Sequence, residues 1–104
     1  MGNEHFVINE EEIPEGIKLL IKGRIDSGNT LELQDKLKHA VENGHLNIIL
    51  NMLWVEFLCS TGIRVILKAY QEMNKAGGSF GIEMPSQHVR NILGMTALDD
   101  LLIR

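Results

Sequence analysis

The chain has 104 residues, of which 44% are hydrophobic and 23% are charged, and its formal net charge at pH 7 is -4. This length suits one globular domain and excludes two, and the acidic charge argues against nucleic-acid binding, which usually needs a basic face. The single cysteine excludes an intramolecular disulfide and agrees with a reducing cytoplasm, where we expect the protein to act.

Two strands are predicted at the start of the chain. Residues 5–9 form the first, with Phe6 and Ile8 on one face, and three consecutive glutamates at residues 10–12 indicate a solvated turn. Residues 16–23 form the second, because apolar residues recur there with the period of two that is typical of a half-buried strand. These alternating residues are Ile17, Leu19 and Ile21. We therefore expect a hairpin-like pair.

A helix and a buried strand follow the hairpin. Asn29 is a predicted N-cap, and Glu32 stands three residues further on, in the manner of a capping box. The buried face of this helix consists of Leu33, Leu37, Ala40 and Val41. Residues 43–44, Asn-Gly, end the helix. Residues 46–53 are mostly apolar, which predicts a central strand covered on both faces and reached by a right-handed crossover.

The last third of the chain contains two more helices and a strand. A second helix begins near Gly62 and runs to about Lys75, and residues 79–84 alternate as a strand. The strand residues expected on one face are Phe80, Ile82 and Met84. A short helix follows over residues 85–93, and residues 98–103 form either a last helical turn or a short edge element. The predicted fold is therefore α/β, a mixed sheet with helices packed on it in the order ββαβαβα.

The residues with reactive side chains form no recognisable catalytic or metal-binding motif. The histidines share no metal-ligand spacing, and neither a Gly-x-Ser-x-Gly elbow nor a phosphate-binding loop is present. These histidines are His5, His39, His45 and His88. Cys59 has no histidine that the sequence places beside it, so we interpret it as a buried structural thiol. We expect no catalytic activity, no cofactor and no metal.

Export and membrane insertion are also not expected. The first residues show neither the basic segment nor the apolar run of a secretory signal peptide. No apolar run approaches the length of about 20 residues that a membrane-spanning helix needs.

The most informative segment is residues 57–63, FLCSTGI, between a buried strand and a helix. Ser60 or Thr61 stands at the predicted helix start, where several backbone N–H groups lack partners. One interpretation is structural: Ser60 is an N-cap, which stabilises a helix by about 1 kcal/mol. The other is a switch, because a phosphate there would meet the positive end of the helix dipole while adding about two negative charges. The fold would tolerate that charge, whereas a partner packed against the helix start would not.

Three segments resemble the STAS domain of bacterial anti-sigma factor antagonists. In that family a strand ends in an aromatic-apolar-Asp-Ser-Ser/Thr-Gly loop, and an apolar helix follows, as in residues 57–63. Residues 23–26, GRID, together with Asn29, resemble the segment before the family's first helix. Residues 89–98, VRNILGMTAL, resemble its closing helix and tail. The resemblance spans residues 6–103 and implies a single STAS-like domain, 1–104, that acts by binding proteins.

The resemblance also implies a phosphorylation switch. Ser60 matches the serine that a partner kinase, itself the anti-sigma factor, phosphorylates, and Thr61 is a secondary candidate. In the family, the dephosphorylated antagonist binds the kinase and frees a sigma factor for transcription, and a serine phosphatase resets the switch. The partner-binding surface implied here consists of Asp26, Cys59, Ser60, Thr61, Gly62 and Arg64. Two residues depart from the family pattern: Cys59 and Asn51 stand where aspartate or another acidic residue is usual.

A second function is compatible with the same family. A STAS domain also serves as a scaffold or regulatory subunit in other partner-switching or lipid-transport complexes, and Ser60 would then not be phosphorylated. Genes for an anti-sigma serine kinase and a serine phosphatase next to this one would favour the antagonist.

Overall fold

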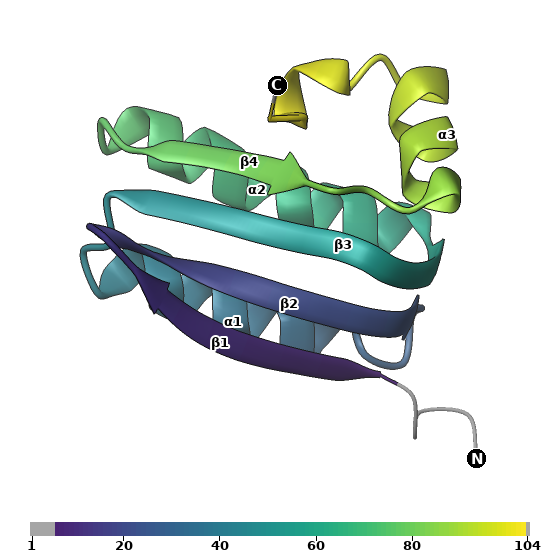
Figure 1. Cartoon of the computed structure of the whole chain (residues 1–104), viewed down its shortest axis with the longest axis horizontal. Helices are drawn as coiled ribbons and strands as arrows, with labels where there is room; N and C mark the ends of the chain where they lie inside the picture. The colour runs from purple at the N-terminus through teal and green to yellow at the C-terminus, as the bar shows by residue number, and fades with distance from the viewer. Residues whose placement is uncertain (1–5, 104) are drawn as a thin grey trace.

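Four strands form one mixed sheet in the computed structural model, which describes residues 6–103 (Figure 1). The sheet order is β1-β2-β3-β4; β1 pairs antiparallel with β2, whereas β2, β3 and β4 are parallel. The predicted fold class and the order ββαβαβα are confirmed. The elements are β1 (Val7–Ile13), β2 (Gly16–Ile25), α1 (Thr30–Glu42), β3 (Asn47–Leu58), α2 (Ser60–Lys75), β4 (Ser79–Glu83), α3 (Gln87–Met95) and a 3₁₀ turn, η1 (Asp99–Leu101).

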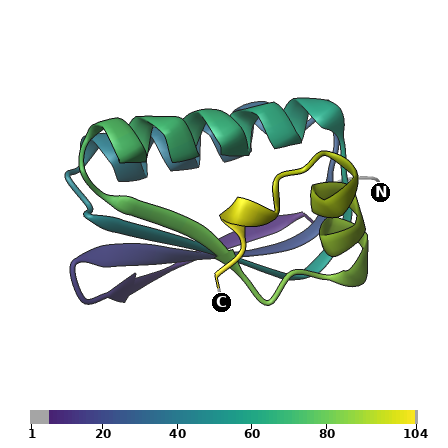
Figure 2. The same cartoon turned by 90° about the horizontal axis from the view of Figure 1, so that it is seen from above.

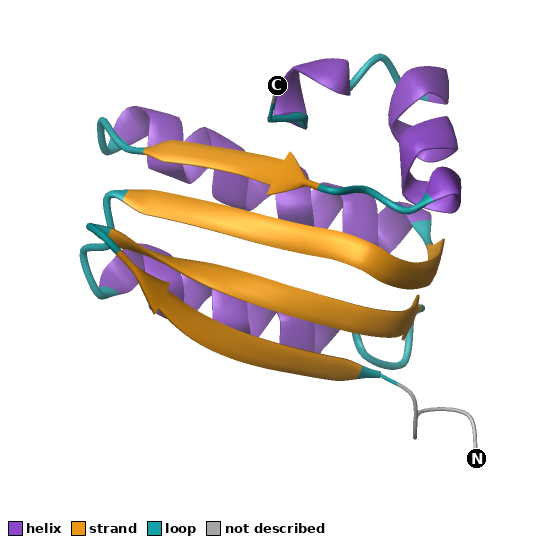
Figure 3. Cartoon of the chain, in the orientation of Figure 1, coloured by secondary structure: helices purple, strands orange, loops and turns teal. Residues whose placement is uncertain are grey.

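The two long helices lie on the same face of the sheet. Helix α1 connects β2 to β3 and α2 connects β3 to β4, and Figures 2 and 3 show both helices as one layer against the strands. The core lies between these layers, and each fully buried Leu or Ile side chain contributes about 1.5–3 kcal/mol. The predicted alternation in β2 is present there, and so is the predicted buried face of α1 except for Val41, which is only half-buried. The least exposed core residues include Leu19, Ile25, Leu33, Ile48, Leu50, Met52, Ile82 and Val89.

The first hairpin differs from the prediction. Residues 10–12 lie within β1, paired with residues 17–19 of β2, and do not form a turn. The turn comes later, at Pro14 and Glu15, where Glu15 adopts a positive φ of 62°. Three glutamates are tolerated in a strand here because β1 has a neighbour on one side only, and charged side chains protect such an edge from pairing with other chains. The predicted strand began at His5, which lies outside the described residues.

Strand β3 is longer than predicted and is covered on one face only. It continues to Leu58, five residues beyond the predicted end. The sequence does not reveal this extension, because two bulges interrupt the alternation that marks a strand. At each bulge β3 has one residue more than β2, so Leu53 and Trp54 are both exposed although they are consecutive. The prediction that this strand is covered on both faces is wrong, because both crossover helices pack on the same side of the sheet.

The C-terminal segment packs beside the sheet. Strand β4 ends at Glu83, not Met84, because Met84 has a φ of 48° that extended strands do not adopt. Helix α3 then starts after Ser86, whose Oγ accepts the Val89 N–H at 3.2 Å, and continues past Gly94. The tail forms the 3₁₀ turn and then a single parallel bridge from Leu102 to Ile82, so both predicted forms occur in succession. Within residues 6–103, no helix is both long enough and apolar enough to cross a membrane.

Candidate partner-binding site

The residues predicted to bind a partner are mostly brought together at the carboxyl ends of β2 and β3. The Cys59 N–H donates a hydrogen bond of 3.0 Å to the Ile25 carbonyl oxygen, so the loop after β2 is fixed to the start of α2. Asp26 and Ser60 each follow one residue beyond this bond. We call residues 26–29 and 58–64 the Ser60 corner. Ligands of open α/β sheets usually bind at this end of parallel strands.

Asn29 closes the loop after β2 on itself. Its Oδ1 accepts the Asp26 N–H at 3.0 Å, its Nδ2 donates to the Arg24 carbonyl oxygen at 2.8 Å, and the residue is only 4% exposed. Asn29 does occupy the N-cap position of α1, but its side chain makes no capping hydrogen bond, so the predicted capping box with Glu32 is wrong. An amide carries both a donor and an acceptor, and here it pairs with a carbonyl oxygen of β2 and with the N–H of the residue that follows β2.

Asp26 is half-buried, and its carboxylate is oriented by its own loop. Oδ1 accepts the Gly28 N–H at 2.9 Å, and the Asp26 carbonyl oxygen accepts the Asn29 N–H at 3.1 Å. Such turns around an aspartate fix the side chain without help from the rest of the fold. A carboxylate is therefore held beside the start of α2.

Ser60 is exposed and is the first helical residue of α2. The N-cap position belongs to Cys59, which is extended and makes no side-chain capping hydrogen bond. The interpretation of Ser60 as the N-cap is thus off by one residue, whereas its placement at the helix start is confirmed. Because the cap side chain satisfies none of the first N–H groups and the first turn has no acidic residue, this end of α2 favours a negative charge.

Gly62 is the buried residue of the Ser60 corner and lets the start of α2 lie close to the sheet. A Cβ atom at Gly62 would lie 2.8 Å from Ile25 Cγ2 and 2.9 Å from Leu58 Cδ1. The first turn of α2 thus packs directly on the ends of β2 and β3, and a larger residue at position 62 would force this packing to shift. Contact between Gly62 and a partner stays a prediction.

Thr61 and Arg64 line a groove to which Asp26 does not belong. Both are exposed, and this groove of about 350 Å³ lies between α1 and α2. Lys38 of α1 and Lys68 of α2 line the same groove, together with Glu42 and Glu72. The predicted surface therefore has two parts, the loop side with Asp26 and Ser60 and the groove side with Thr61 and Arg64.

A stack of three side chains that the sequence did not reveal lies beside the corner. The Cζ atom of Arg24 lies 4.5 Å from the centre of the Phe57 ring, and the Phe57 and His88 rings are 5.5 Å apart. His88 Nε2 also accepts the Leu58 N–H at 3.1 Å. These residues come from β2, β3 and α3, and no local pattern relates residues 30 positions apart.

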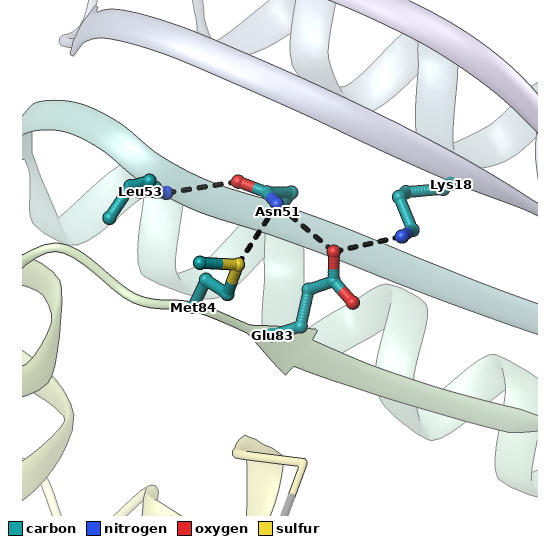
Figure 4. Close-up of polar contacts among 5 residues, drawn as sticks. All are labelled: Lys18, Asn51, Leu53, Glu83 and Met84. Atoms are coloured by element: carbon teal, nitrogen blue, oxygen red, sulfur yellow. Dashed lines mark hydrogen bonds and ion pairs between the residues drawn. The ribbon is translucent and has the colours of Figure 1, made fainter.

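On the sheet face away from α1 and α2, Asn51 belongs to a polar network (Figure 4). Glu83 Oε2 accepts a hydrogen bond of 3.0 Å from Asn51 Nδ2 and pairs at 3.0 Å with Lys18 Nζ, while Asn51 Oδ1 accepts the Leu53 N–H at 3.2 Å. Burial alone would raise the pKa of Glu83, but the hydrogen bonds from Lys18 and Asn51 and the Lys18 charge outweigh it and lower that pKa. An aspartate at position 51 could not donate this bond, which explains locally why an amide suits this position.

Metal ligands are not gathered in the part of the chain that the structure describes: no three His, Cys, Asp or Glu residues of residues 6–103 lie close enough to hold an ion.

Comparison with known proteins identifies the class. Residues 8–104 match the model of the STAS domain, and the chain therefore belongs to the STAS domain family. The anti-sigma factor antagonist SpoIIAA in its unphosphorylated form has a TM-score of 0.82 at 20% identity, over 93% of this chain and 86% of that one.

Two further solved structures are similar. An anti-sigma factor antagonist from Mycobacterium paratuberculosis gives a TM-score of 0.84 at 21% identity, over 93% of this chain and 82% of that one. The Bacillus cell fate determinant SpoIIAA in its phosphorylated form gives 0.77 at 19% identity, over 93% of this chain and 89% of that one. At these identities the similarity establishes a shared fold.

Proposed function

We propose that this protein is an anti-sigma factor antagonist whose dephosphorylated form binds an anti-sigma factor of the serine kinase type and so releases a sigma factor. Phosphorylation of Ser60 ends the binding, and a serine phosphatase restores it. The position of Ser60 carries this proposal, because the serine is exposed at the first residue of α2 and directly follows Cys59, whose N–H joins α2 to the residue before Asp26. We place this action in the bacterial cytoplasm, because the proposed partner is a kinase that uses ATP and that holds a sigma factor.

The physical chemistry of the Ser60 corner suits a switch that changes binding without unfolding the domain. A phosphate brings about two negative charges and three acceptor oxygens. The uncapped N-terminus of α2, whose first turn has no acidic residue, favours those charges, so the folded state loses little. A partner that covers the corner must instead desolvate the phosphate next to Asp26, which costs binding free energy.

We infer that the protein acts by binding and not by catalysis. Among the hydrogen bonds within residues 6–103, none joins the Ser60 or Cys59 side chain to a base. The nearby imidazole of His88 is already engaged by the Leu58 N–H. An activated serine or cysteine nucleophile requires a base within hydrogen-bond reach.

A second candidate function is a scaffold or regulatory STAS subunit in another partner-switching or lipid-transport complex, without phosphorylation. The observation that favours it is Cys59, a half-buried thiol at the position before Ser60 where the family usually has a carboxylate. A kinase that recognises that carboxylate would not find it here.

Mass spectrometry distinguishes the two functions. The protein is incubated with ATP and the anti-sigma kinase encoded nearest to it, and the peptide containing Ser60 and Thr61 is sequenced. We expect one phosphate on Ser60, its loss in Ser60→Ala, and its retention in the matched control Thr61→Val. A phosphate on Thr61 alone would move the acceptor by one residue, and an unmodified peptide would favour the scaffold.

A further inference from the structure

The last residues of β3 have no strand neighbour on the side of β4. Strand β3 spans Asn47–Leu58, but β4 pairs only with residues 47–51. Beyond that point the segment leading into α3 takes over the edge. The Ser86 N–H donates to the Met52 carbonyl oxygen at 3.0 Å, and His88 Nε2 accepts the Leu58 N–H at 3.1 Å. The imidazole thus supplies the acceptor that a further strand would otherwise supply.

This hydrogen bond requires the neutral ring. Because the Leu58 N–H points at Nε2, that nitrogen carries the lone pair and Nδ1 carries the proton. An imidazolium donates from both nitrogens, so protonation would bring two N–H groups face to face and leave the Leu58 amide without its acceptor.

The surroundings of His88 add a second effect of protonation. Arg24 of β2 lies over the Phe57 ring, which also contacts His88, so a protonated ring would add a second cation to the same stack. The groove that His88 helps to line also contains Lys22 of β2, which opposes a positive ring, and Glu56 of β3, which favours one.

We propose that His88 is a positioning residue that holds the junction between β3 and α2 through its neutral imidazole, and that acidification releases this junction and weakens binding at the Ser60 corner. Leu58 is two residues from Ser60, and its side chain lies against Gly62 in the first turn of α2. Imidazoles ordinarily gain a proton between about pH 5 and 8, within the range a bacterium encounters. The effect on the junction is independent of the proposed function, whereas the effect on binding rests on it.

Nuclear magnetic resonance tests the junction directly in the full chain. Spectra of the amides of residues 58–60 and of the His88 ring nitrogens are recorded from pH 8 to pH 5.5. We expect the ring at pH 8 to carry its proton on Nδ1, and the Leu58 amide to move with the same midpoint as the ring. A Leu58 amide that ignores the titration of His88, or a ring protonated on Nε2 at pH 8, would overturn the proposal.

Two variants separate positioning from mere packing. In His88→Gln the side-chain oxygen replaces Nε2 as an acceptor but does not titrate, so the junction should keep its pH 8 state throughout. In His88→Leu the acceptor is lost, so the junction should resemble the acidic state at every pH. His39→Gln, on the exposed face of α1, is the matched control and should retain the full pH response. A complete pH response in His88→Gln would contradict the proposal.

Affinity for the anti-sigma factor, measured at pH 8 and pH 6, completes the test. We expect the wild-type protein and His39→Gln to lose about tenfold in affinity on acidification, relative to His88→Gln, while His88→Leu binds weakly at both values. If no variant binds at any pH while the junction titrates as described, the proposed function fails and the role of His88 stands. If binding occurs and His88→Gln responds to pH like the wild type, the role of His88 fails and the function stands.

Discussion

The Cys59 N–H donates to the Ile25 carbonyl oxygen at 3.0 Å, so Asp26 and Ser60 each follow one residue beyond the same bond at the end of the sheet. Each of these residues follows a parallel strand that ends at the same edge, which is why a loop after residue 25 and a helix start at residue 60 meet. The proposed switch depends on this meeting, because a phosphate on Ser60 acts both on Asp26 and on whatever covers the corner.

Gly62→Ala should destabilise the domain. The new Cβ would lie 2.8 Å from Ile25 Cγ2 and 2.9 Å from Leu58 Cδ1, so the first turn of α2 must shift, at a cost of about 1–3 kcal/mol. Gly94→Ala in α3 is the matched control, because no heavy atom lies within 4 Å of its Cβ and alanine favours a helix by about 1 kcal/mol. Urea unfolding should show a lower free energy of unfolding for Gly62→Ala and a higher one for Gly94→Ala, each relative to the wild type. Equal changes in the two variants would mean that α2 does not pack this closely.

Asn29→Ala should cost about 1–3 kcal/mol in the free energy of unfolding, because two partly buried backbone groups, the Asp26 N–H and the Arg24 carbonyl oxygen, lose their partners. Glu32→Ala should change it by less than about 0.5 kcal/mol, since Glu32 is exposed and no capping box forms. Thermal unfolding of the two variants checks both values. A larger loss for Glu32→Ala than for Asn29→Ala would restore the capping box that the sequence predicted.

The network of Glu83, Lys18 and Asn51 should make stability fall in acid. The pKa of Glu83 is lowered from its ordinary value of 4.5 in the folded state. The unfolded chain therefore binds more protons between the two values, so this stabilisation is complete above pH 4.5 and is lost as pH falls through the folded pKa. Because the pair is partly exposed, the contribution should be about 1 kcal/mol or less.

The test is urea unfolding of the wild type and Glu83→Gln from pH 7 to pH 3. The difference in unfolding free energy between them should shrink as the pH falls below 4.5. A difference that stays constant with pH would show that the ionised carboxylate does not stabilise the fold.

Most of the architecture follows from periodicity, and the failures have separate physical reasons. Alternation identified β2 because one face of it is buried, and helical spacing identified α2 to Lys75. Residues 10–12 were misjudged because an edge strand accepts charges that a central strand does not. The end of β3 was missed because each bulge shifts the alternation by one residue.

The candidate site was partly predictable. The segment around Ser60 stands out because strand spacing changes there to helical spacing, and the structure places Ser60 at the helix start. The hydrogen bonds of the Asn29 side chain to the preceding loop were not predictable, since the same residue types cap helices and close loops. His88 could not be found, because its contact with Leu58 depends on where α3 packs against β3.

A titration of the purified protein against its anti-sigma factor decides whether Ser60 is the switch. Three forms are compared by calorimetry: unmodified, Ser60→Ala, and phosphorylated on Ser60, with thermal unfolding of each as a control. We predict similar affinities for the first two, a loss of about 100-fold for the phosphorylated form, and similar unfolding midpoints for all three. Equal affinity of the Ser60→Ala and phosphorylated forms would contradict the switch, and a large drop in the midpoint on phosphorylation would contradict the favourable placement of the phosphate at the start of α2.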